Sequence, residues 1–223
     1  NPNIESALAS AIRAKREAER AERSLQARTT FYASSLGMCP RRLILDRAGV
    51  APEEVLDQRS EFKLWIGTAL GRQVQELLTQ EGFLEADWTE KRFSYRSFSG
   101  RVDGYTARIN GGCIVELKTC DDRAITKPDW PEHYLWQSLW YCIAANVPSA
   151  LILMIGKSQG LTRHRVVSLD AAWRKKIEEE IDLIESLWAK HETTGLVPKC
   201  RHRFAWEDRY CPYADKADQQ GEA

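Results

Sequence analysis

The feature that most constrains the fold is an apolar segment that carries two opposite charges. Residues 111–122 read GGCIVELKTCDD, and Glu116 and Lys118 stand among β-forming residues. Residues two apart on a strand point to the same face, so Glu116 and Lys118 share one face, while Val115 and Leu117 occupy the other. The segment is therefore either an exposed strand with an ordinary ion pair or a central strand with one apolar face and one face for chemistry.

An acidic residue in the preceding segment favours the central strand. Asp103 stands between two glycines in the stretch GRVDG, and a short connection predicts a hairpin between strands at 101–109 and 113–119. Asp103 and Glu116 would then lie side by side. Two adjacent carboxylates repel each other unless a cation lies between them, and their hard oxygen atoms suit Mg²⁺ or Mn²⁺.

Lys118 would lie on the same face as both carboxylates. Its ammonium group would orient a water molecule or balance the negative charge that develops during phosphate chemistry. A metal ion held by the carboxylates would polarise a phosphate and make a bound water more acidic. Together the three groups indicate metal-assisted hydrolysis of a phosphodiester.

Hydrophobic periodicity predicts an α/β fold around a central mixed sheet flanked by helices. Helices are expected at 34–49, 60–82, 132–146 and 170–192, and strands at 92–98, 101–109, 113–119, 150–155 and 162–168. The first three strands are expected to form a meander. An apolar stripe of the second helix is expected to face the core, and it consists of Ile66, Leu70, Val74, Leu77 and Leu78.

Composition limits the class of protein. Apolar residues make up 43% of the chain, charged residues 29%, and the formal net charge is zero, so nucleic acid would need a local basic surface. The longest apolar run, residues 150–155, has the length of a strand, and no secretory signal is visible. We therefore expect a cytoplasmic protein that does not span a membrane and whose cysteines are not disulfides.

Two domain-level segments are expected. Residues 1–30 alternate Ala, Arg, Lys and Glu, which favours a charged helix with little to bury and a possible role in binding a protein partner. Residues 31–223 are expected to form a single catalytic domain.

Polar lines at four-residue spacing run along two of the expected helices. They consist of His133, Gln137 and Tyr141 on one helix, and of Gly67, Gly71 and Gln75 on the other. Glycines inside a helix indicate that another backbone approaches closely. We expect both lines to face the carboxylate site, although Gln137 is also compatible with a solvated position.

Three motifs in this order resemble those of RecB-type nucleases of the PD-(D/E)xK superfamily. They are G-x-x-D at 100–103, E-x-K at 116–118 and Q-x-x-x-Y at 137–141. The pattern is similar to that of the small CRISPR-associated RecB-like nucleases and related phage exonucleases. The resemblance implies a restriction-endonuclease-like core and cleavage of DNA that depends on Mg²⁺ or Mn²⁺.

The resemblance also assigns roles to the motif residues. Asp103, Glu116 and the Leu117 carbonyl group would hold the metal ion, and Lys118 would be catalytic. The remaining motif residues, Gln137 and Tyr141, would support the site and contact the DNA strand.

One departure concerns the first core helix. Many members of the superfamily have G-x-x-x-H there, with the histidine as a metal ligand, whereas this chain reads GRQVQ at 71–75. The oxygen atom of Gln75 is a weaker ligand than imidazole. The resemblance therefore leaves a second metal position open, with Gln75 as its candidate ligand.

A second departure concerns the cysteines. The small members often hold a [4Fe–4S] cluster through one early cysteine and three near the C-terminus. Cys39 matches the first position, and Cys200 and Cys211 match two of the others. A degenerate cluster, a Zn²⁺ site that adds His202, and no metal at all remain as alternatives. Any such metal would bring the tail, residues 196–223, back near Cys39.

Basic and aromatic residues flank these cysteines. Contacts to DNA are expected from Arg41, Arg42, Arg201, Arg203 and Tyr210, with Tyr213 as a second stacking residue. If the early and late cysteines converge, these cations form a local patch in a neutral protein. Each arginine taken singly is equally compatible with an ordinary solvated surface.

The sequence therefore predicts a deoxyribonuclease, specifically an exonuclease that acts on single-stranded DNA or DNA ends. The alternative is a DNA-binding or recruiting subunit of a recombination or repair complex that does not cleave. The charged N-terminal segment and the incomplete cysteine set favour this alternative, whereas the complete set of Asp103, Glu116 and Lys118 argues against it. We see no added specificity domain, as a restriction-type endonuclease would need, in 223 residues.

Overall fold

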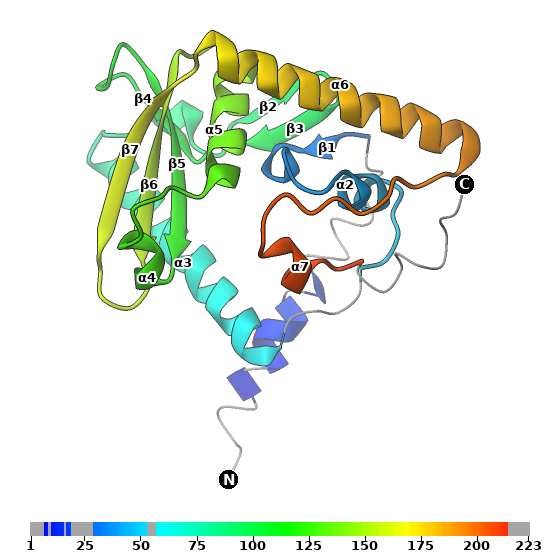
Figure 1. Ribbon diagram of the computed structural model, residues 1–223. Helices are drawn as coiled ribbons and strands as arrows, with labels where there is room; N and C mark the ends of the chain where they lie inside the picture. The colour runs from blue at the N-terminus through cyan, green and yellow to red at the C-terminus, as the bar shows by residue number, and fades with distance from the viewer. Residues whose placement is uncertain (1–6, 9, 16, 19–28, 53–56, 214–223) are drawn as a thin grey trace.

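The computed structural model describes residues 7–8, 10–15, 17–18, 29–52 and 57–213 (Figure 1). The described residues between 7 and 18 are helical, and the rest of the charged helix expected at 1–30 lies outside the described residues. Ile12 is buried, and the Arg13 Nε atom lies 3.8 Å from Glu61 Oε2. This part of the chain therefore packs beside helix α3 (Gln58–Gln80).

The other expected elements are present with different boundaries, except that the single strand expected at 92–98 is wrong, because the chain turns at residues 96–97, where Arg96 has a φ of +54°. The helices are η1 (Ala33–Ser35), α2 (Pro40–Arg47), η2 (Ala86–Trp88), α4 (Asp122–Ile125), α5 (Glu132–Ala145), α6 (Ala171–Thr194) and α7 (Glu207–Tyr210). The strands are β1 (Phe31–Tyr32), β2 (Arg92–Tyr95), β3 (Phe98–Arg101), β4 (Gly104–Thr106), β5 (Cys113–Cys120), β6 (Ser149–Gly156) and β7 (Thr162–Ser168). The helix expected at 34–49 is shorter, because Pro40 begins α2 and Gly49, with a φ of +74°, follows its end.

The strands form two sheets rather than one. A four-stranded sheet has the order β4-β5-β6-β7, in which β5 and β6 are parallel and the outer pairs are antiparallel. Helix α5 connects the two parallel strands, as a parallel pair requires. A separate three-stranded sheet has the order β1-β3-β2. The expected mixed sheet is confirmed, with β5 in its interior.

The expected three-strand meander is wrong. Strands β2 and β3 pair with each other, and β3 then pairs with β1 instead of with β5. The chain leaves this first sheet at Val102, whose N–H group donates to the Lys91 carbonyl, and enters the second sheet at Gly104. The strand expected at 101–109 is therefore divided between two sheets, and Asp103 lies at the crossing between them.

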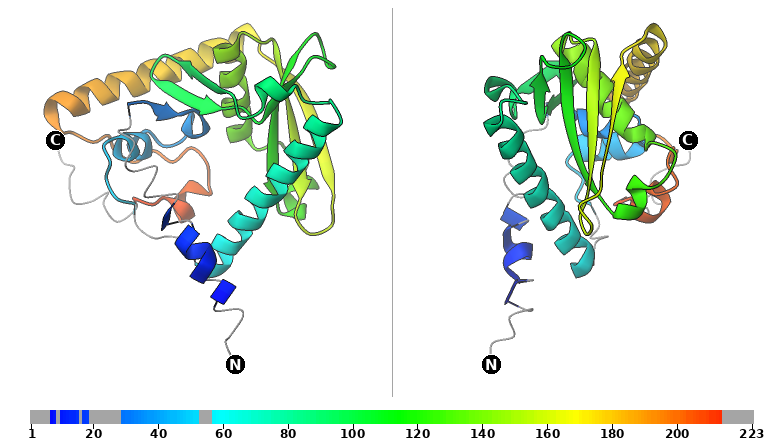
Figure 2. Two further views of the ribbon diagram at one scale, coloured as in Figure 1. Left: turned by 180° about the vertical axis from the view of Figure 1, so that it is seen from behind. Right: turned by 90° about the vertical axis from the view of Figure 1, so that its left-hand side faces the viewer.

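The two faces of β5 contact different helices (Figure 2). On one face Ile114 packs in the larger core with Trp136 and Trp140 of α5, which α6 also covers. On the other face Val115 packs in a smaller cluster together with Leu78 of α3. Glu116 and Lys118 share the α5 face with Ile114 by the alternation of the strand. The charges thus lie on the same face as the main core, at its edge.

The apolar stripe of α3 is less buried than expected. Leu77 is 57% exposed, and the other four members of the stripe are only partly buried. The glycine line faces β5 instead, because a Cβ atom at Gly67 would come within 2.6 Å of Thr119 Oγ1. The close approach expected at these glycines is found at Gly67 alone, where the side chains of Thr119 and Lys157 rather than a backbone come near, whereas Gly71 has ordinary space around it.

Two glycines of α3 give opposite expectations for substitution by alanine. Gly67→Ala forces a Cβ atom against Thr119 Oγ1, and we expect a loss of about 1–3 kcal/mol in the free energy of unfolding. Gly71→Ala is the matched control, since its Cβ atom would meet nothing closer than Thr119 Cγ2 at 3.8 Å. Its better helix propensity should stabilise the protein by about 0.5–1 kcal/mol. Urea titration of both variants measures the difference, and equal effects would contradict this packing.

Candidate active site

The end of β5 brings a lysine, a glutamate and a glutamine into one hydrogen-bonded group. Lys118 Nζ donates to Glu116 Oε1 at 2.6 Å and to Gln137 Oε1 of α5 at 2.8 Å. Burial disfavours the ammonium form, but the carboxylates of Glu116 and Asp103 outweigh it and raise the pKa of Lys118. The expected shared face of Glu116 and Lys118 is confirmed, and Lys118 keeps its positive charge.

Asp103 lies beside this group, as the predicted hairpin requires. Gly104 pairs with Val115 in the antiparallel ladder, so Asp103 comes opposite the Glu116 position. Its Oδ2 atom accepts a hydrogen bond from the Leu117 N–H group at 2.6 Å. Burial, and then the charge of Glu116, raises the pKa of Asp103 to about 8, although Lys118 and the Leu117 N–H group oppose the shift. The two carboxylates are therefore close enough to repel each other.

Tyr141 connects α5 to the segment that carries Asp103. Its hydroxyl group donates to the Arg101 carbonyl at 2.7 Å, and a Cβ atom added at Gly100 would come within 2.5 Å of that hydroxyl. The glycine of the first motif is thus needed for the tyrosine of the third motif. Gln137 and Tyr141 are both buried, and both lie with the carboxylates as expected.

His133, the first residue of the same polar line, lies outside the hydrogen-bonded group. Its ring packs against Phe204 and Trp206 of the tail, each with a centroid distance of 5.5 Å. Burial and the charge of Lys118 lower the pKa of His133 to about 4. The imidazole is therefore neutral near pH 7 and forms part of the contact between tail and α5.

Gln75 reaches the site from α3 on the other side. Its Nε2 atom donates to the Asp103 carbonyl at 2.6 Å and to Glu90 Oε1 at 3.2 Å. The amide group therefore holds the turn that carries Asp103. Its role as a metal ligand remains a prediction.

Glu90 is a site residue that sequence reasoning missed. It adopts a φ of +57°, its Oε2 atom pairs with Arg101 Nη1 at 2.9 Å, and its charge contributes to the raised pKa of Asp103. No motif or periodicity marks this position, because it lies in a turn between η2 and β2. The hydrogen bond from Gln75 holds the Glu90 carboxylate at the edge of the site, where it is the third carboxylate beside those of Asp103 and Glu116.

The donor set fits a divalent cation. Glu116 is 2% exposed, and its Oε2 atom has no hydrogen-bond partner among the described residues. A buried carboxylate oxygen without a partner is costly, and a second carboxylate alongside increases the cost. A cation bound between Asp103 and Glu116 would remove both penalties. The contribution of the Leu117 carbonyl to such a site stays a prediction.

The structure brings together three of the four candidate ligands of the expected iron–sulfur or zinc site. The thiol and imidazole groups of Cys39, Cys200 and His202 all lie within 4.8 Å of one another. Cys211 is buried with Leu45 and lies outside this group. Burial, and then Cys39, raises the pKa of Cys200 to about 12. The described part of the tail, residues 196–213, therefore returns to Cys39.

The expected basic patch is only partly present. Arg41 is 3% exposed and donates to the Pro198 carbonyl, so the expectation that it lies on the DNA-binding surface is wrong. Tyr213 is also buried, and its hydroxyl group bonds to Asp46, which excludes base stacking. Both residues fasten the tail to α2.

The other residues of the patch differ in exposure. Arg42 lies 3.8 Å from Asp46 of α2, and Arg203 Nη2 donates to Glu180 at 2.8 Å with its guanidinium group over Trp136. Arg201 and Tyr210 are exposed. A role in DNA binding stays a prediction for all four residues.

The raised pKa of Asp103 predicts a pH dependence of stability. The carboxyl group of Asp103 has a pKa of about 8 in the folded protein and of 3.8 in the unfolded chain, so between these pH values the folded protein binds more protons than the unfolded chain. The free energy of unfolding of the metal-free protein should therefore fall as the pH rises from about 4 to about 8. In Asp103→Asn this component of the slope should disappear, and the variant should be more stable than the wild type at pH 9. Denaturant titrations in EDTA test this, and a destabilised variant at pH 9 would contradict it.

The contact between Gly100 and Tyr141 is open to a double-mutant cycle. Gly100→Ala should destabilise the protein by about 1–3 kcal/mol, because its Cβ atom meets the Tyr141 hydroxyl and the Ala33 Cβ atom. Tyr141→Phe should cost about 0.5–1.5 kcal/mol through the lost hydrogen bond to Arg101. The double variant should be less destabilised than the sum of both. Strict additivity would show that the two residues do not share this contact.

Comparison with known proteins supports the architecture. No protein-family model matches the chain, and no curated protein sequence is significantly similar to it. The crystal structure of SSO0001 is similar over 87% of this chain and 88% of its own, with a TM-score of 0.55 and 16% identity. An alkaline exonuclease, LHK-Exo from Laribacter hongkongensis, is similar over 78% of this chain and 96% of its own, with a TM-score of 0.56 and 15% identity. The complex of LHK-Exo with dAMP gives a TM-score of 0.55 at 14% identity, over 76% of this chain and 93% of its own.

Within the described residues no helix combines the length and the apolar character needed to cross a membrane.

The paired strands, the helices on both faces of β5 and the likeness to LHK-Exo agree with one another. The chain has a restriction-endonuclease-like fold, with its acidic cluster on β5, which lies in the interior of the four-stranded sheet.

Proposed function

We propose that this protein is a divalent-metal-dependent deoxyribonuclease that hydrolyses phosphodiester bonds, and that it acts as an exonuclease on single-stranded DNA or DNA ends. The observation that carries the proposal is the arrangement of Asp103, Glu116 and Lys118, in which one buried oxygen atom of Glu116 has no hydrogen-bond partner within the described part of the chain. The shared fold with an alkaline exonuclease supports it. A solved complex of that exonuclease holds dAMP, a nucleotide, which supports DNA as the substrate.

The carboxylates of Asp103 and Glu116 would hold Mg²⁺ or Mn²⁺, with the Leu117 carbonyl as a third ligand and Gln75 near a second position. When bound, the cation supplies positive charge at the phosphate and lowers the pKa of a coordinated water. Glu90 adds negative charge at the same edge. The side chains of the protein would position the phosphate and stabilise the charge that develops on it.

Lys118 would supply the positive charge that the reaction needs beside the scissile phosphate. It is a fixed ammonium group, because Glu116 and Gln137 both accept its hydrogen bonds. A preorganised charge stabilises a developing negative charge without reorganisation during the reaction. Tyr141 positions this group indirectly, since it ties α5 to the Arg101 carbonyl two residues before Asp103.

DNA would approach over the surface beside α5 and the tail. Arg201 and Tyr210 are exposed there, and they would contact a phosphate and a base of the strand. The charged segment at residues 1–30 would serve a protein partner, and this part of the proposal rests on its composition.

Nuclease assays with labelled DNA test the function directly. We expect degradation of linear DNA with Mg²⁺ or Mn²⁺ and none with EDTA. Glu116→Gln and Lys118→Ala should each lower the rate by at least about 100-fold, because Glu116→Gln removes a carboxylate that would hold the cation and Lys118→Ala removes the positive charge beside the phosphate. Lys175→Ala on the exposed face of α6 is the matched control and should keep the full rate.

The form of the DNA separates the possible outcomes. An exonuclease leaves a covalently closed circle intact, so equal cleavage of circular and linear DNA would contradict exonuclease action. Binding of DNA without cleavage under all metal conditions would favour the non-cleaving subunit instead. Full activity in Glu116→Gln would show that the cleavage takes place at a site other than the one formed by Asp103, Glu116 and Lys118.

A further inference from the structure

Two segments far apart in the sequence meet outside the candidate active site. Cys39 stands immediately before α2, and Cys200 and His202 belong to the tail. Cys39 Sγ lies 3.6 Å from Cys200 Sγ, and Cys200 Sγ lies 2.9 Å from His202 Nε2. Two thiols and an imidazole, whose ligand atoms all lie within 4.8 Å of one another, form a set of ligands that could bind one metal ion.

We propose that Cys39, Cys200 and His202 bind a single Zn²⁺ ion that fastens the tail to the first residues of the nuclease fold. Tetrahedral zinc with bonds of 2.0–2.3 Å holds its sulfur and nitrogen ligands about 3.5–3.8 Å apart. The distance between the two Sγ atoms falls in this range, and the short distance from Cys200 to His202 needs only a small lengthening. A mixture of thiolate and imidazole ligands is typical of structural zinc sites.

A [4Fe–4S] cluster does not fit these positions. In such a cluster each cysteine binds a different iron atom, so the ligand sulfurs lie farther apart than the ligands of one ion. Two Sγ atoms 3.6 Å apart instead match one shared ion. Their separation also exceeds the length of about 2.05 Å of a disulfide bond.

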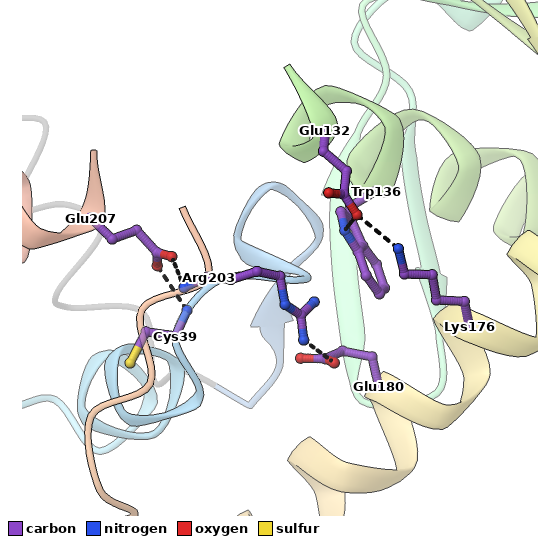
Figure 3. Close-up of polar contacts among 7 residues, drawn as sticks. All are labelled: Cys39, Glu132, Trp136, Lys176, Glu180, Arg203 and Glu207. Carbon is purple, nitrogen blue, oxygen red and sulfur yellow. Dashed lines mark hydrogen bonds and ion pairs between the residues drawn. The ribbon is translucent and has the colours of Figure 1, made fainter. Parts of the chain in front are cut away.

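The backbone around the ligands is already held in place by a buried carboxylate (Figure 3). Glu207, which is 1% exposed, accepts from the Cys39 N–H group at 2.8 Å through Oε1. Its Oε2 atom accepts from the N–H groups of Arg203 and Phe204. One side chain therefore orders both ligand-bearing segments, as outer-shell groups do in metal sites.

A second backbone contact is directed at a ligand itself. The Arg201 N–H group donates to Cys39 Sγ at 3.3 Å. Such a bond stabilises the thiolate form that a metal ligand must adopt. Arg201 lies between the two tail ligands, Cys200 and His202, so the backbone of the tail itself contacts the Cys39 sulfur.

We assign the fourth coordination position to Cys211. Its thiol lies outside the 4.8 Å group of the other three ligands, but it is buried on the turn that directly follows α7. Glu207, four residues before Cys211, bonds to the Cys39 N–H group, so α7 brings Cys211 to the same part of the fold as the other three ligands. Three sulfurs and one nitrogen then complete a closed structural site.

The site would act on the position of the tail rather than on the reaction. Arg203 follows His202 directly and contacts both Glu180 of α6 and Trp136 of α5. Phe204 and Trp206 continue the same segment and pack on His133. A zinc ion at Cys39 would therefore hold these contacts against α5, the helix that carries Gln137.

Metal analysis of the full-length protein tests the proposal without any measurement of nuclease activity. Cells are grown with both iron and zinc, and the protein is purified without oxygen so that a cluster would survive. We expect one zinc per chain and no acid-labile sulfide. Replacement by Co²⁺ should give the thiolate-to-metal absorption of a tetrahedral site. Iron with inorganic sulfide, no tightly bound metal, or a disulfide between Cys39 and Cys200 would each overturn the proposal.

Variants identify the ligands. Cys200→Ser and His202→Ala should each lower the zinc content and abolish the fall in melting temperature that a chelator causes in the wild type. Cys211→Ser should weaken zinc binding at least about 10-fold, and an unchanged affinity would refute its place in the site. Cys113→Ala is the matched control, since it removes a buried thiol in β5 and should lose stability but keep zinc. Equal zinc loss in the control would contradict the assignment, and the cobalt spectrum of the wild type stands even if a variant fails to fold.

Discussion

The arrangement of the site depends on the two hydrogen bonds of one partly buried ammonium group, that of Lys118. Lys118 donates to Glu116 on its own strand and to Gln137 on α5, so it joins the central strand to the helix that crosses it. Loss of Glu116 would leave the Lys118 charge without its ion-pair partner, whereas loss of Gln137 would remove a neutral hydrogen-bond acceptor. The position of α5 along β5 is therefore determined by this charge together with the apolar core beside it. Tyr141, one turn further along α5, is carried to the Arg101 carbonyl by the same arrangement.

Glycine makes the close contacts around this centre possible. Gly100 leaves room for the Tyr141 hydroxyl group, and Gly67 lets α3 approach Thr119 on the opposite face of β5. Neither position has room for a Cβ atom, which would lie within 2.6 Å of a neighbouring side chain. The acidic cluster is consequently held from two sides, by α5 above one face of the strand and by Gln75 of α3 at its edge. Positions that look conformationally permissive in the sequence are the ones where the packing is tightest.

Much of this centre follows from local pattern. The alternation of residues 113–119 correctly assigned Glu116 and Lys118 to one face, and the short connection correctly placed Asp103 beside them. The four-residue spacing correctly brought Gln137 and Tyr141 to the same place. These inferences hold because each depends only on the geometry of one strand, one hairpin or one helix. Glu90 could not be found in this way, since a turn has no period and its hydrogen bond to Gln75 joins two separate elements.

The failures share a physical cause as well. The stripe on α3 is apolar, yet the glycine line is buried, because the available space on β5 and not the hydrophobicity of the helix selected the face. Arg41 is charged, yet it lies under the tail, because the Pro198 carbonyl accepts its hydrogen bond there. The strand expected at 101–109 divides between two sheets, because β3 pairs with β1 and β2, whereas β4 pairs with β5. The sequence by itself determined the residue types of the site, their shared faces and the order of the elements, since these follow from local periodicity. Only the tertiary structure decided which faces are buried, which cations remain exposed and which cysteines meet, since these depend on contacts between segments distant in the chain.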